Sequence, residues 1–287
     1  MNCFYIITNS VKDKELLVTH KISNYLKEHG KSCVIQQSDH ANNNGSFHYT
    51  DVSQIPENVD CVIVLGGDGT LLQAARDVVD RQLPLCGINL GTLGYLAEID
   101  EYSVYPALDH LMGDDYEIER RMMLCGSVYH NGELLEQDIA LNDIVISRER
   151  SLCVVKFHNY VNDEFLNSYN ADGIIIATPT GSTGYSLSAG GPIISPDASM
   201  ILMTPLAPHT LNTRSIVFSD NDKITVEIGP GRDEMIERGM AAFDGDTTVP
   251  MVTGDRIVIE KSTKDTSIIK INNVSFLETL RKKMNNS

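Results

Sequence analysis

The apolar residues in the first third of the chain form short runs that alternate with amphipathic stretches. Runs at residues 4–7, 32–35, 61–65 and 84–88 predict strands. The helical spacing of Leu16, Leu17, Ile22, Tyr25 and Leu26 predicts a helix from Asp13 to His29, and a second helix is predicted from Leu71 to Val79. Strands that alternate with helices are typical of a parallel sheet with helices on its faces. Residues 1–112 are therefore predicted to form an α/β domain.

The pattern changes after Gly113, where short β-rich stretches alternate with Gly, Asn and Asp turns. Strands are predicted at residues 123–129, 144–147, 153–158, 173–177, 215–219, 223–228 and 256–260. Asn131-Gly132 is a strong hairpin-turn signal. Residues 113–265 are therefore predicted to form an all-β, sandwich-like domain. A further helix is predicted from Val274 to Arg281.

A glycine-rich turn with one carboxylate, Gly66-Gly67-Asp68-Gly69-Thr70, follows a buried apolar strand. Glycines let the backbone turn sharply and approach a ligand closely, because no Cβ stands in the way. The N-terminus of the following helix favours an anion. The turn lacks both the Gly-Lys-Ser/Thr of a P-loop and the spacing of the G-x-G-x-x-G fingerprint. It is predicted to bind phosphate through Gly66, Gly67, Gly69 and Thr70, with Asp68 beside it; a turn that only connects a strand to a helix is the alternative.

This turn lies at the carboxyl end of its strand, where open α/β sheets bind ligands. The next strand ends in the segment 89–95, which is predicted to line the same crevice. The long polar segment from Gln37 to Glu57 is predicted to be a surface loop, with a lid as the alternative.

A second glycine-rich block, Thr178–Pro192, follows another strand-like run and supplies hydroxyls, backbone N–H groups and a tyrosine. Such groups suit a polyhydroxylated ligand that carries phosphate, and a short helix near Ser182 would direct further N–H groups at an anion. The alternative is a Ser/Gly-rich linker. Between the two glycine blocks, Asn142-Asp143 precedes a β-branched run, although an Asn-Asp pair is otherwise ordinary turn chemistry.

Taken in order, the GGDGT turn, the Asn-acid pair and Asp172-Gly173 leading into TPTGSTGYSLSAGGP resemble the NAD kinase family. The resemblance runs from Cys61 to Gly245. It implies phosphoryl transfer from ATP, another nucleoside triphosphate or polyphosphate to the adenosine 2′-hydroxyl of NAD. It also implies a homodimer or homotetramer, and a C-terminal segment, residues 266–287, that packs back on the N-terminal domain. Two alternatives stay open: another GGDGT kinase, acting on a lipid or a sugar phosphate, and a non-catalytic NAD(P)-binding sensor.

The resemblance assigns roles to individual residues. Asp68 is expected to orient the 2′-hydroxyl and accept its proton, and the alternative role is that of a magnesium ligand. Asn142 and Asp143 are expected to hydrogen-bond ribose or base, where an acid would repel a 2′-phosphate. Gly184 departs from the family, which commonly has alanine there. The residues expected to contact NAD are Asp68, Gly69, Tyr95, Asn142, Asp143, Asp172, Thr183, Gly184, Tyr185, Ser186, Leu187 and Ser188.

Composition narrows the choice of partners. Hydrophobic residues make up 42% and charged residues 22% of the chain, as in globular proteins, and no apolar run is long enough to span a membrane. The formal charge of −16 argues against nucleic acid and anionic membranes as partners. The six cysteines are scattered without a C-x-x-C pair, so we expect a cytoplasmic protein with neither a disulfide framework nor a zinc site. ATP and NAD are anions, so a divalent cation, Mg²⁺ or Mn²⁺, is the expected cofactor, with no metal-ligating residue assigned.

Overall fold

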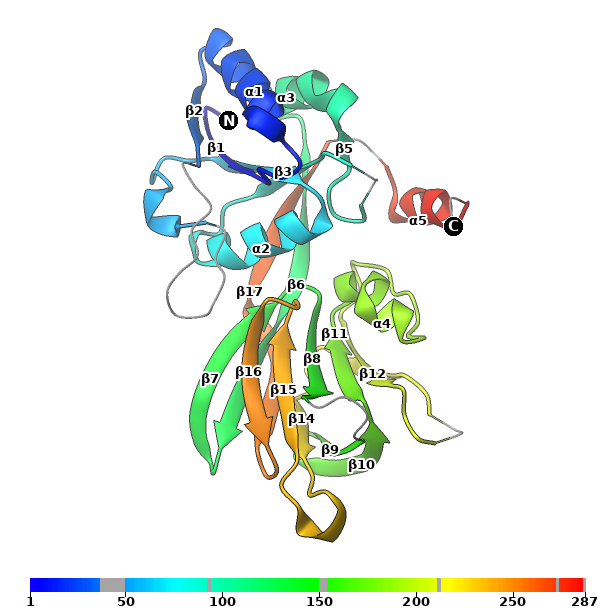
Figure 1. Ribbon diagram of the computed structural model, residues 1–287. Coiled ribbons are helices and arrows are strands. Elements are labelled where there is room, and N and C mark those ends of the chain that lie inside the picture. Colours follow the sequence, from blue (N-terminus) through cyan, green and yellow to red (C-terminus); the bar gives the residue numbers. More distant parts are fainter. Residues whose placement is uncertain (37–49, 92–93, 150–153, 211–212, 272–273, 286–287) are drawn as a thin grey trace. The chain divides into compact units, whose positions relative to one another are not determined.

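The structure is a computed structural model that describes residues 1–36, 50–91, 94–149, 154–210, 213–271 and 274–285. The chain forms two compact units. Described residues up to Arg121 and from Asp265 onward make up unit 1, and Met122 to Lys264 make up unit 2. Two long strands, β6 (Glu117–His130) and β17 (Arg256–Lys270), run from one unit into the other (Figure 1). The predicted boundary at 112/113 precedes β6, whereas the change of unit lies inside this strand.

Unit 1 is built on a parallel sheet with the strand order β2–β1–β3–β4, which continues to the last residues of β17. Every residue of β1 and β3 is buried, which accounts for their uninterrupted apolar sequences. The four strands predicted in this part of the chain are confirmed. The strands are β1 (Cys3–Thr8), β2 (Ser32–Ile35), β3 (Cys61–Gly66), β4 (Leu85–Asn89) and the short β5 (Ile99–Asp100).

Helices cover both faces of this sheet. On one face, α1 (Leu17–Glu28) and α3 (Val104–Met112) contribute Ile22, Leu26 and Leu108 to a core that also contains Ile6 and Ile63 of the sheet. On the opposite face lies α2 (Asp68–Val78), which packs on β3 and β4 (Figure 1). The C-terminal helix α5 (Phe276–Asn285) belongs to the same unit. The carboxyl ends of β1, β3 and β4 therefore share one edge of a helix-covered sheet.

The predicted helix from Asp13 to His29 is wrong at its start. Glu15 and Leu16 have φ angles of 56° and 54°, in the left-handed region, so a short 3₁₀ turn precedes an α-helix that begins only at Leu17. The Asp13 carboxylate accepts hydrogen bonds from the backbone of Val18 and Thr19, both at 2.9 Å, which stabilises the later start.

The predicted loop from Gln37 to Glu57 is described only in its last part. Residues 37–49 lie outside the described residues, and the remainder contains the 3₁₀ turn Val52–Gln54. The other 3₁₀ turns are Lys14–Leu16, Val79–Arg81, Glu101–Ser103, Thr180–Thr183 and Arg232–Glu234.

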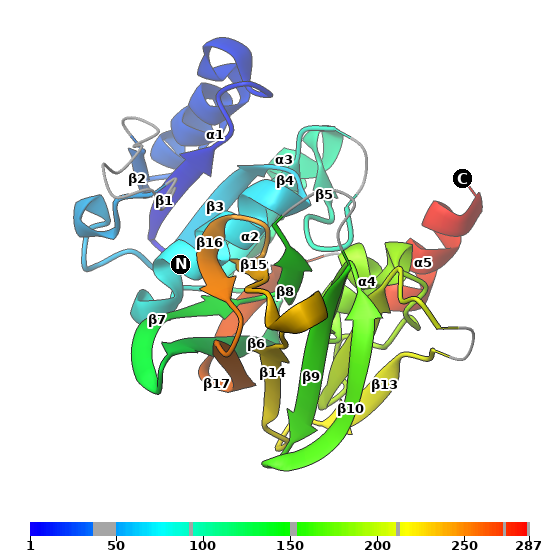
Figure 2. The same ribbon diagram turned by 60° about the horizontal axis from the view of Figure 1, so that its bottom comes forward.

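Unit 2 contains two antiparallel sheets that enclose one core, and Figure 2 shows their strands from a second direction. One sheet has the order β10–β9–β14–β17, in which β6 pairs with β17 and β7 pairs with β6; the other has the order β13–β12–β11–β8–β15–β16. Phe157 of the first sheet and Ile176 and Phe243 of the second meet in the core. The further elements are β7 (Glu133–Ala140), β8 (Asp143–Arg148), β9 (Val155–Val161), β10 (Glu164–Ala171), β11 (Gly173–Ala177), α4 (Tyr185–Ser188), β12 (Met200–Leu206), β13 (Ile216–Ser219), β14 (Ile224–Ile228), β15 (Arg238–Phe243) and β16 (Thr247–Val252).

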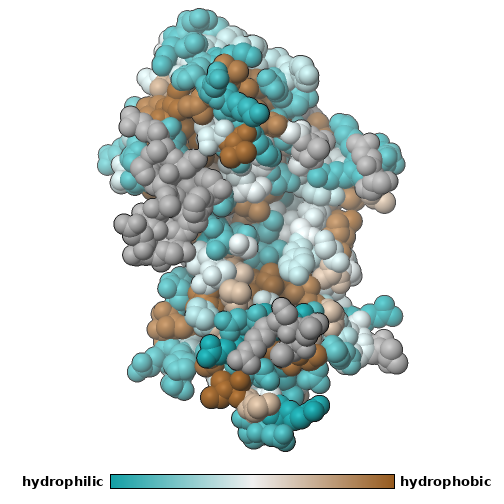
Figure 3. All heavy atoms as spheres, viewed as in Figure 1, coloured by the Kyte–Doolittle hydropathy of each residue, from teal (hydrophilic) through white to brown (hydrophobic). Residues whose placement is uncertain are grey.

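The predicted hairpin is confirmed, because Asn131 and Gly132 join β6 to β7 with φ angles of 50° and 84°. No helix among the described residues is long and apolar enough to cross a membrane. On the face shown in Figure 3, hydrophilic residues are spread over both units, and hydrophobic residues occur in small separate groups.

Candidate active site

The glycine turn of unit 1 connects β3 to α2. Gly66 is the last residue of β3, and a Cβ there would lie 2.3 Å from the Oγ1 atom of Thr70, so only glycine lets the first turn of α2 pack this closely. Gly67 is the N-cap of α2 and Asp68 its first residue, earlier than the predicted start at Leu71. No atom lies within 4 Å of the position that a Cβ of Gly69 would take, so a ligand can approach the backbone there.

The carboxylate of Asp68 holds the loop that follows β4. Its Oδ2 atom accepts a hydrogen bond from the backbone N–H of Tyr95 (2.7 Å), and its Oδ1 atom accepts from Leu96 (3.1 Å) and Ala97 (3.2 Å). The carboxylate also lies against Gly94, where a Cβ would be only 1.8 Å from Oδ1. An ionised carboxylate has about four acceptor positions, so one position on Oδ2 is left for a hydroxyl group.

A cation that the motifs did not reveal stands over the glycine turn. Lys12 lies in the loop after β1, and its Nζ atom is 2.8 Å from the Cβ position of Gly67 and 3.8 Å from that of Gly91. Asn9 holds this loop, because its Oδ1 atom accepts hydrogen bonds from the backbone of Val11 (3.1 Å) and Lys12 (3.2 Å). Lys12 is thus placed to bind an anion at the N-terminus of α2.

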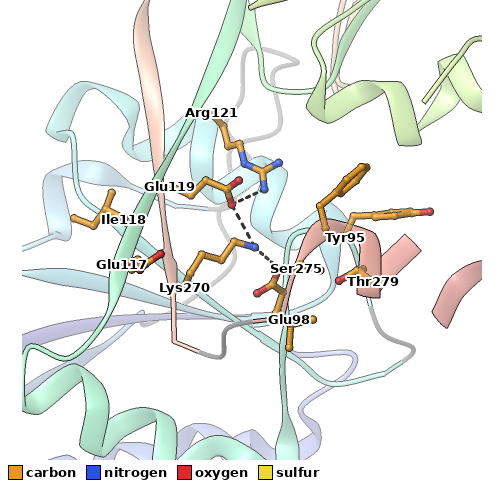
Figure 4. Close-up of a pocket in the computed structure, with 11 residues that line it drawn as sticks. Tyr95, Glu98, Glu117, Ile118, Glu119, Arg121, Lys270, Ser275 and Thr279 are labelled. Atoms are coloured by element: carbon orange, nitrogen blue, oxygen red, sulfur yellow. Dashed lines mark hydrogen bonds and ion pairs between the residues drawn. The ribbon is translucent and has the colours of Figure 1, made fainter. Parts of the chain in front are cut away.

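A cavity of about 390 Å³ opens beside the Tyr95 loop, with walls from β6, β17 and α5 (Figure 4). Lys270 forms ion pairs with Glu98 and, at 3.4 Å, with Glu119, which also pairs with Arg121 at 2.7 Å. Burial raises the pKa of Glu98, and the charge of Lys270 opposes that rise. The acids of this cavity already pair with both cations, so it offers no surplus positive charge to a phosphate chain.

The ring of Tyr95 forms part of the same cavity wall and is supported by α5. Its centroid lies 6.4 Å from that of Phe276, and the Lys283 Nζ atom lies 4.5 Å from it, within cation–π range. Burial and the charge of Asp68 raise the pKa of Tyr95. The loop that Asp68 holds is therefore also held by the C-terminal helix.

In unit 2, the start of the second glycine block packs directly on the Asn-acid pair. The backbone N–H of Thr178 donates to the carbonyl of Asn142 (2.9 Å), and the Thr178 hydroxyl donates to the carbonyl of Leu141 (2.6 Å). A Cβ on Gly181 would lie 2.0 Å from the Asn142 carbonyl oxygen, so the close contact requires glycine. The linker alternative is therefore wrong for this segment, which is ordered against β8.

Asp143 is the first residue of β8 and only 6% exposed. Burial, reinforced by the nearby charge of Asp244, raises the pKa of Asp143 to about 7. Asp244 follows β15, and its carboxylate accepts hydrogen bonds from the backbone of Leu141, Asn142 and Asp143 at 2.7, 2.8 and 3.0 Å. Two acids from distant parts of the chain thus meet at the Asn-acid pair.

The predicted NAD-binding segment 183–188 divides into structural and accessible residues. Ser186 is fully buried, and its hydroxyl lies 3.0 Å from that of Thr204, which indicates a packing role. Tyr185, Leu187 and Ser188 are exposed and remain open to a ligand. The predicted helix near Ser182 consists of a 3₁₀ turn and the four-residue α4, too short to act as an anion-binding helix terminus.

Asp172 lies apart from these residues. It precedes β11, whereas Thr178 follows it, so the six residue steps between them place the two about 20 Å apart at opposite ends of the strand. Its carboxylate forms a bidentate ion pair with Arg148 (2.8 and 3.1 Å). The structure therefore groups Gly66–Thr70 with Tyr95 in unit 1, groups Asn142, Asp143 and Gly184 in unit 2, and leaves Asp172 outside the second group.

Comparison with known proteins gives the family. The model of the ATP-NAD kinase N-terminal domain matches residues 5–116, and that of the ATP-NAD kinase C-terminal domain matches residues 141–271. The NAD kinase of Lachnospira eligens is 47% identical over 99% of this chain and 100% of its own length. The NAD kinase of Agathobacter rectalis is 46% identical over 100% and 99%. The chain belongs to the ATP-NAD kinase family.

Solved structures of this family show the same fold. Yeast NADH kinase, solved as a complex with NADH, superposes with a TM-score of 0.84 at 24% identity and covers 99% of this chain and 88% of its own. An NAD kinase from Archaeoglobus fulgidus, solved in complex with ATP, gives 0.75 at 23% identity and covers both chains fully. The predicted α/β domain followed by a β-sandwich domain is confirmed.

Membership of the ATP-NAD kinase family makes the chain a phosphotransferase with an alcohol acceptor. The departure at Gly184 fits the structure. An alanine Cβ there would lie 3.3 Å from the carbonyl oxygen of Gly181 and 3.5 and 3.7 Å from the side chains of Asn142 and Asp143, a tight but tolerable fit. Across the described residues, no group of three or more His, Cys, Asp or Glu side chains is arranged to hold a metal ion.

Two residues of the candidate site, Lys12 and Asp244, carry no motif that would predict them from the sequence. Lys12 follows the first strand, and the rule that ligands bind at the carboxyl ends of parallel strands would have directed attention to its loop. Asp244 sits in Asp244-Gly245, an ordinary turn signal, and its contact with Asn142 spans 102 residues of sequence. No local pattern marks such a contact.

Proposed function

We propose that the chain transfers a phosphoryl group from ATP, another nucleoside triphosphate or polyphosphate to the adenosine 2′-hydroxyl of NAD, giving NADP. The observation that carries the proposal is the Asp68 carboxylate. It stands at the N-terminus of α2, next to the open backbone of Gly69, with three acceptor positions filled and one left. The curated relatives named NAD kinase match the chain over nearly its full length.

In this proposal Asp68 acts as the proton acceptor. The 2′-hydroxyl donates its hydrogen bond to the remaining position on Oδ2 and passes its proton there while its oxygen bonds to the transferred phosphorus. The bond from that phosphorus to the leaving phosphate oxygen breaks at the same time, and the nucleoside diphosphate departs. Such transfers pass through loose transition states, so the placement of the two oxygens and of positive charge does most of the work.

Positive charge at the phosphates has two proposed sources. Lys12 stands over Gly67 at the N-terminus of α2, and the backbone of the glycine turn adds partial charges. A bound Mg²⁺ or Mn²⁺ neutralises phosphate oxygens. Mg²⁺ usually keeps water and phosphate ligands and takes only one or two carboxylates, so the absence of a ligand cluster among the described residues is compatible with a cation that arrives with the triphosphate.

In unit 2, we propose that Asn142, Asp143, Thr183 and the accessible residues of the segment 185–188 contact NAD. The expected cytoplasmic localisation and the homodimer or homotetramer also remain part of this proposal. So does the absence of nucleic acid and membrane partners, which the formal charge of −16 supports.

An acceptor panel tests the proposal. The purified chain is incubated with ATP and Mg²⁺ and, separately, with NAD, NADH, a diacylglycerol or fructose 6-phosphate. Product is measured by chromatography, and NAD binding is measured by calorimetry. We expect NAD to be phosphorylated and the lipid and sugar to be left unchanged. Turnover of lipid or sugar alone would replace the proposal by another GGDGT kinase, and NAD binding without turnover would replace it by a sensor.

A further inference from the structure

Asp244 closes one end of β8 by a three-fold contact. Its Oδ2 atom accepts the backbone N–H of Leu141, and its Oδ1 atom accepts those of Asn142 and Asp143. In return, the backbone N–H of Asp244 donates to the carbonyl of Asp143 at 2.9 Å. Three donors to one carboxylate stabilise its negative charge and fix the turn that presents the Asn142 and Asp143 side chains.

The carboxyl group of Asp143 has the opposite surroundings. It is 6% exposed, and burial and the charge of Asp244 act on its pKa, with no hydrogen bond from a described residue among the causes. Its Oδ2 atom is 3.7 Å from the Cβ position of Gly184, on the side of the second glycine block. Across the pair with β11 stands Ala177, and the adjoining turn of α4 carries Tyr185 as its titratable side chain. The charged group that acts on Asp143 is Asp244.

When a buried carboxyl group lies close enough to a second one to feel its charge, the two do not both stay ionised below the raised pKa of the buried one. Asp244 has three N–H donors and Asp143 has none, so the charge resides on Asp244 and the proton on Asp143. The raised pKa of Asp143, about 7, agrees with this division.

We infer that Asp244 is a positioning residue that holds Asp143 as a neutral carboxylic acid, which donates a hydrogen bond to a ribose hydroxyl oxygen of NAD. The inference rests on the proposed function for its ligand, but not for the location of the proton. It changes the expected role of Asp143, because a neutral acid binds a hydroxyl oxygen as a donor and does not repel a 2′-phosphate. Repulsion would begin only where Asp143 ionises.

The first experiment locates the proton without any ligand. Thermal stability is measured from about pH 5 to about pH 9 for the wild type and for Asp143→Asn, which has the shape of the neutral acid. The folded wild type keeps a proton that the unfolded chain releases above about pH 4, so stability is lost as the pH rises towards the folded pKa. We expect the Tm of the wild type to fall relative to Asp143→Asn between about pH 5 and about pH 7 and then to stay level.

If the difference in Tm between the wild type and Asp143→Asn stayed constant from about pH 5 to about pH 7, Asp143 would be ionised throughout and the inference would be overturned. The matched control is Asp163→Asn, whose carboxylate is 78% exposed and pairs with Lys223; its difference from the wild type should not follow this curve. Asp244→Asn removes the neighbouring charge and should move the fall to lower pH. If Asp244→Asn does not fold, the comparison of the wild type with Asp143→Asn still decides the location of the proton.

The second experiment tests the donor role by calorimetry of NAD binding at constant ionic strength. The Kd of the wild type should be level up to about pH 6, about double by about pH 7 and rise at least about tenfold by about pH 9, as the neutral acid is lost. The Kd of Asp143→Asn, which keeps a donor, should be level throughout. Parallel curves for both proteins would overturn the donor role. NAD binding by neither protein at any pH would instead overturn the proposed function, and the melting curves would still report on the proton.

Discussion

Replacement of Asp68 by asparagine removes the negative charge of the side chain and turns one of its two acceptor oxygens into an NH₂ group. The wild-type carboxylate accepts from Tyr95 on one oxygen and from Leu96 and Ala97 on the other. The single side-chain oxygen of asparagine can still accept the two hydrogen bonds from Leu96 and Ala97. Its NH₂ group then faces the backbone N–H of Tyr95, and two donors cannot form a hydrogen bond. The variant therefore loses the proton acceptor and, in addition, one anchor of the Tyr95 loop.

The two losses have different sizes and appear in different measurements. A positioned base contributes about 10²–10⁴-fold to the rate, so kcat should fall by at least about 10²-fold. Loss of one hydrogen bond to a charged group, with a donor left facing a donor, costs about 1.5–3 kcal/mol of folding stability. NAD should still bind, because the carboxylate is one of several contacts expected for the nucleotide.

The assay follows NADP through an NADP-specific dehydrogenase, with Tm and NAD affinity measured on the same preparations. Gly94→Ala provides the comparison, because its Cβ would lie 1.8 Å from Oδ1 of Asp68 and so displaces the carboxylate without removing its charge. Asp115→Asn, in which an 80% exposed carboxylate is neutralised, is the control for charge alone. We expect the fall in kcat to be much larger in Asp68→Asn than in Gly94→Ala at a similar loss of stability.

Near-normal turnover of Asp68→Asn would remove Asp68 from the role of proton acceptor. An equal fall of kcat in Gly94→Ala would show that the position of the carboxylate matters as much as its charge.

Three further predictions concern phosphate and the second glycine block. Lys12→Met should raise the KM for ATP by about 5- to 30-fold at nearly constant kcat, because its ammonium group stands over Gly67; Lys14→Met is the control, and equal KM values would contradict the assignment. Gly181→Ala should weaken NAD binding by at least about tenfold and lower the Tm, whereas Gly184→Ala should change both little. A larger loss of NAD affinity in Gly184→Ala than in Gly181→Ala, measured by calorimetry, would contradict the assigned packing of Gly181 against Asn142. Chelation by EDTA should abolish turnover and Mg²⁺ or Mn²⁺ restore it, with no zinc by elemental analysis; full activity in EDTA would refute the phosphate scheme.

The sequence predicted those parts of the fold whose cause is local. The run at residues 61–65 is apolar throughout because β3 is buried on both faces, and Asn131-Gly132 marks a hairpin because both residues adopt positive φ. The strand β10 was missed because five of its eight residues are exposed, and its position depends on pairing with β9. The late start of α1 at Leu17 could not be predicted, because the spacing of hydrophobic residues carries no information on the positive φ angles that precede it.

The same division applies to the candidate site. Asp68 and its glycines are recognisable because a tight turn and a close backbone approach need glycine at fixed positions. Lys12 and Asp244 are not, because a lysine in a surface loop and an aspartate before a glycine are common and acquire a role only through tertiary contacts. The low exposure of Asp143, which sets its pKa, likewise depends on packing that no sequence motif encodes.

Unit 1 is assembled from two stretches of chain that are separated by unit 2, and this sets an order of events during synthesis. Unit 2 is available to fold once Lys264 has left the ribosome. At that moment β4 still lacks the partner it gains at Ile268, and Tyr95 still lacks Phe276. Limited proteolysis of a chain truncated after Lys264 should therefore cut near Tyr95 more readily than near Asn142; equal protection would contradict this order. The turn of unit 2 that carries Asn142 and Asp143 would then be formed before the loop around the Asp68 carboxylate is complete.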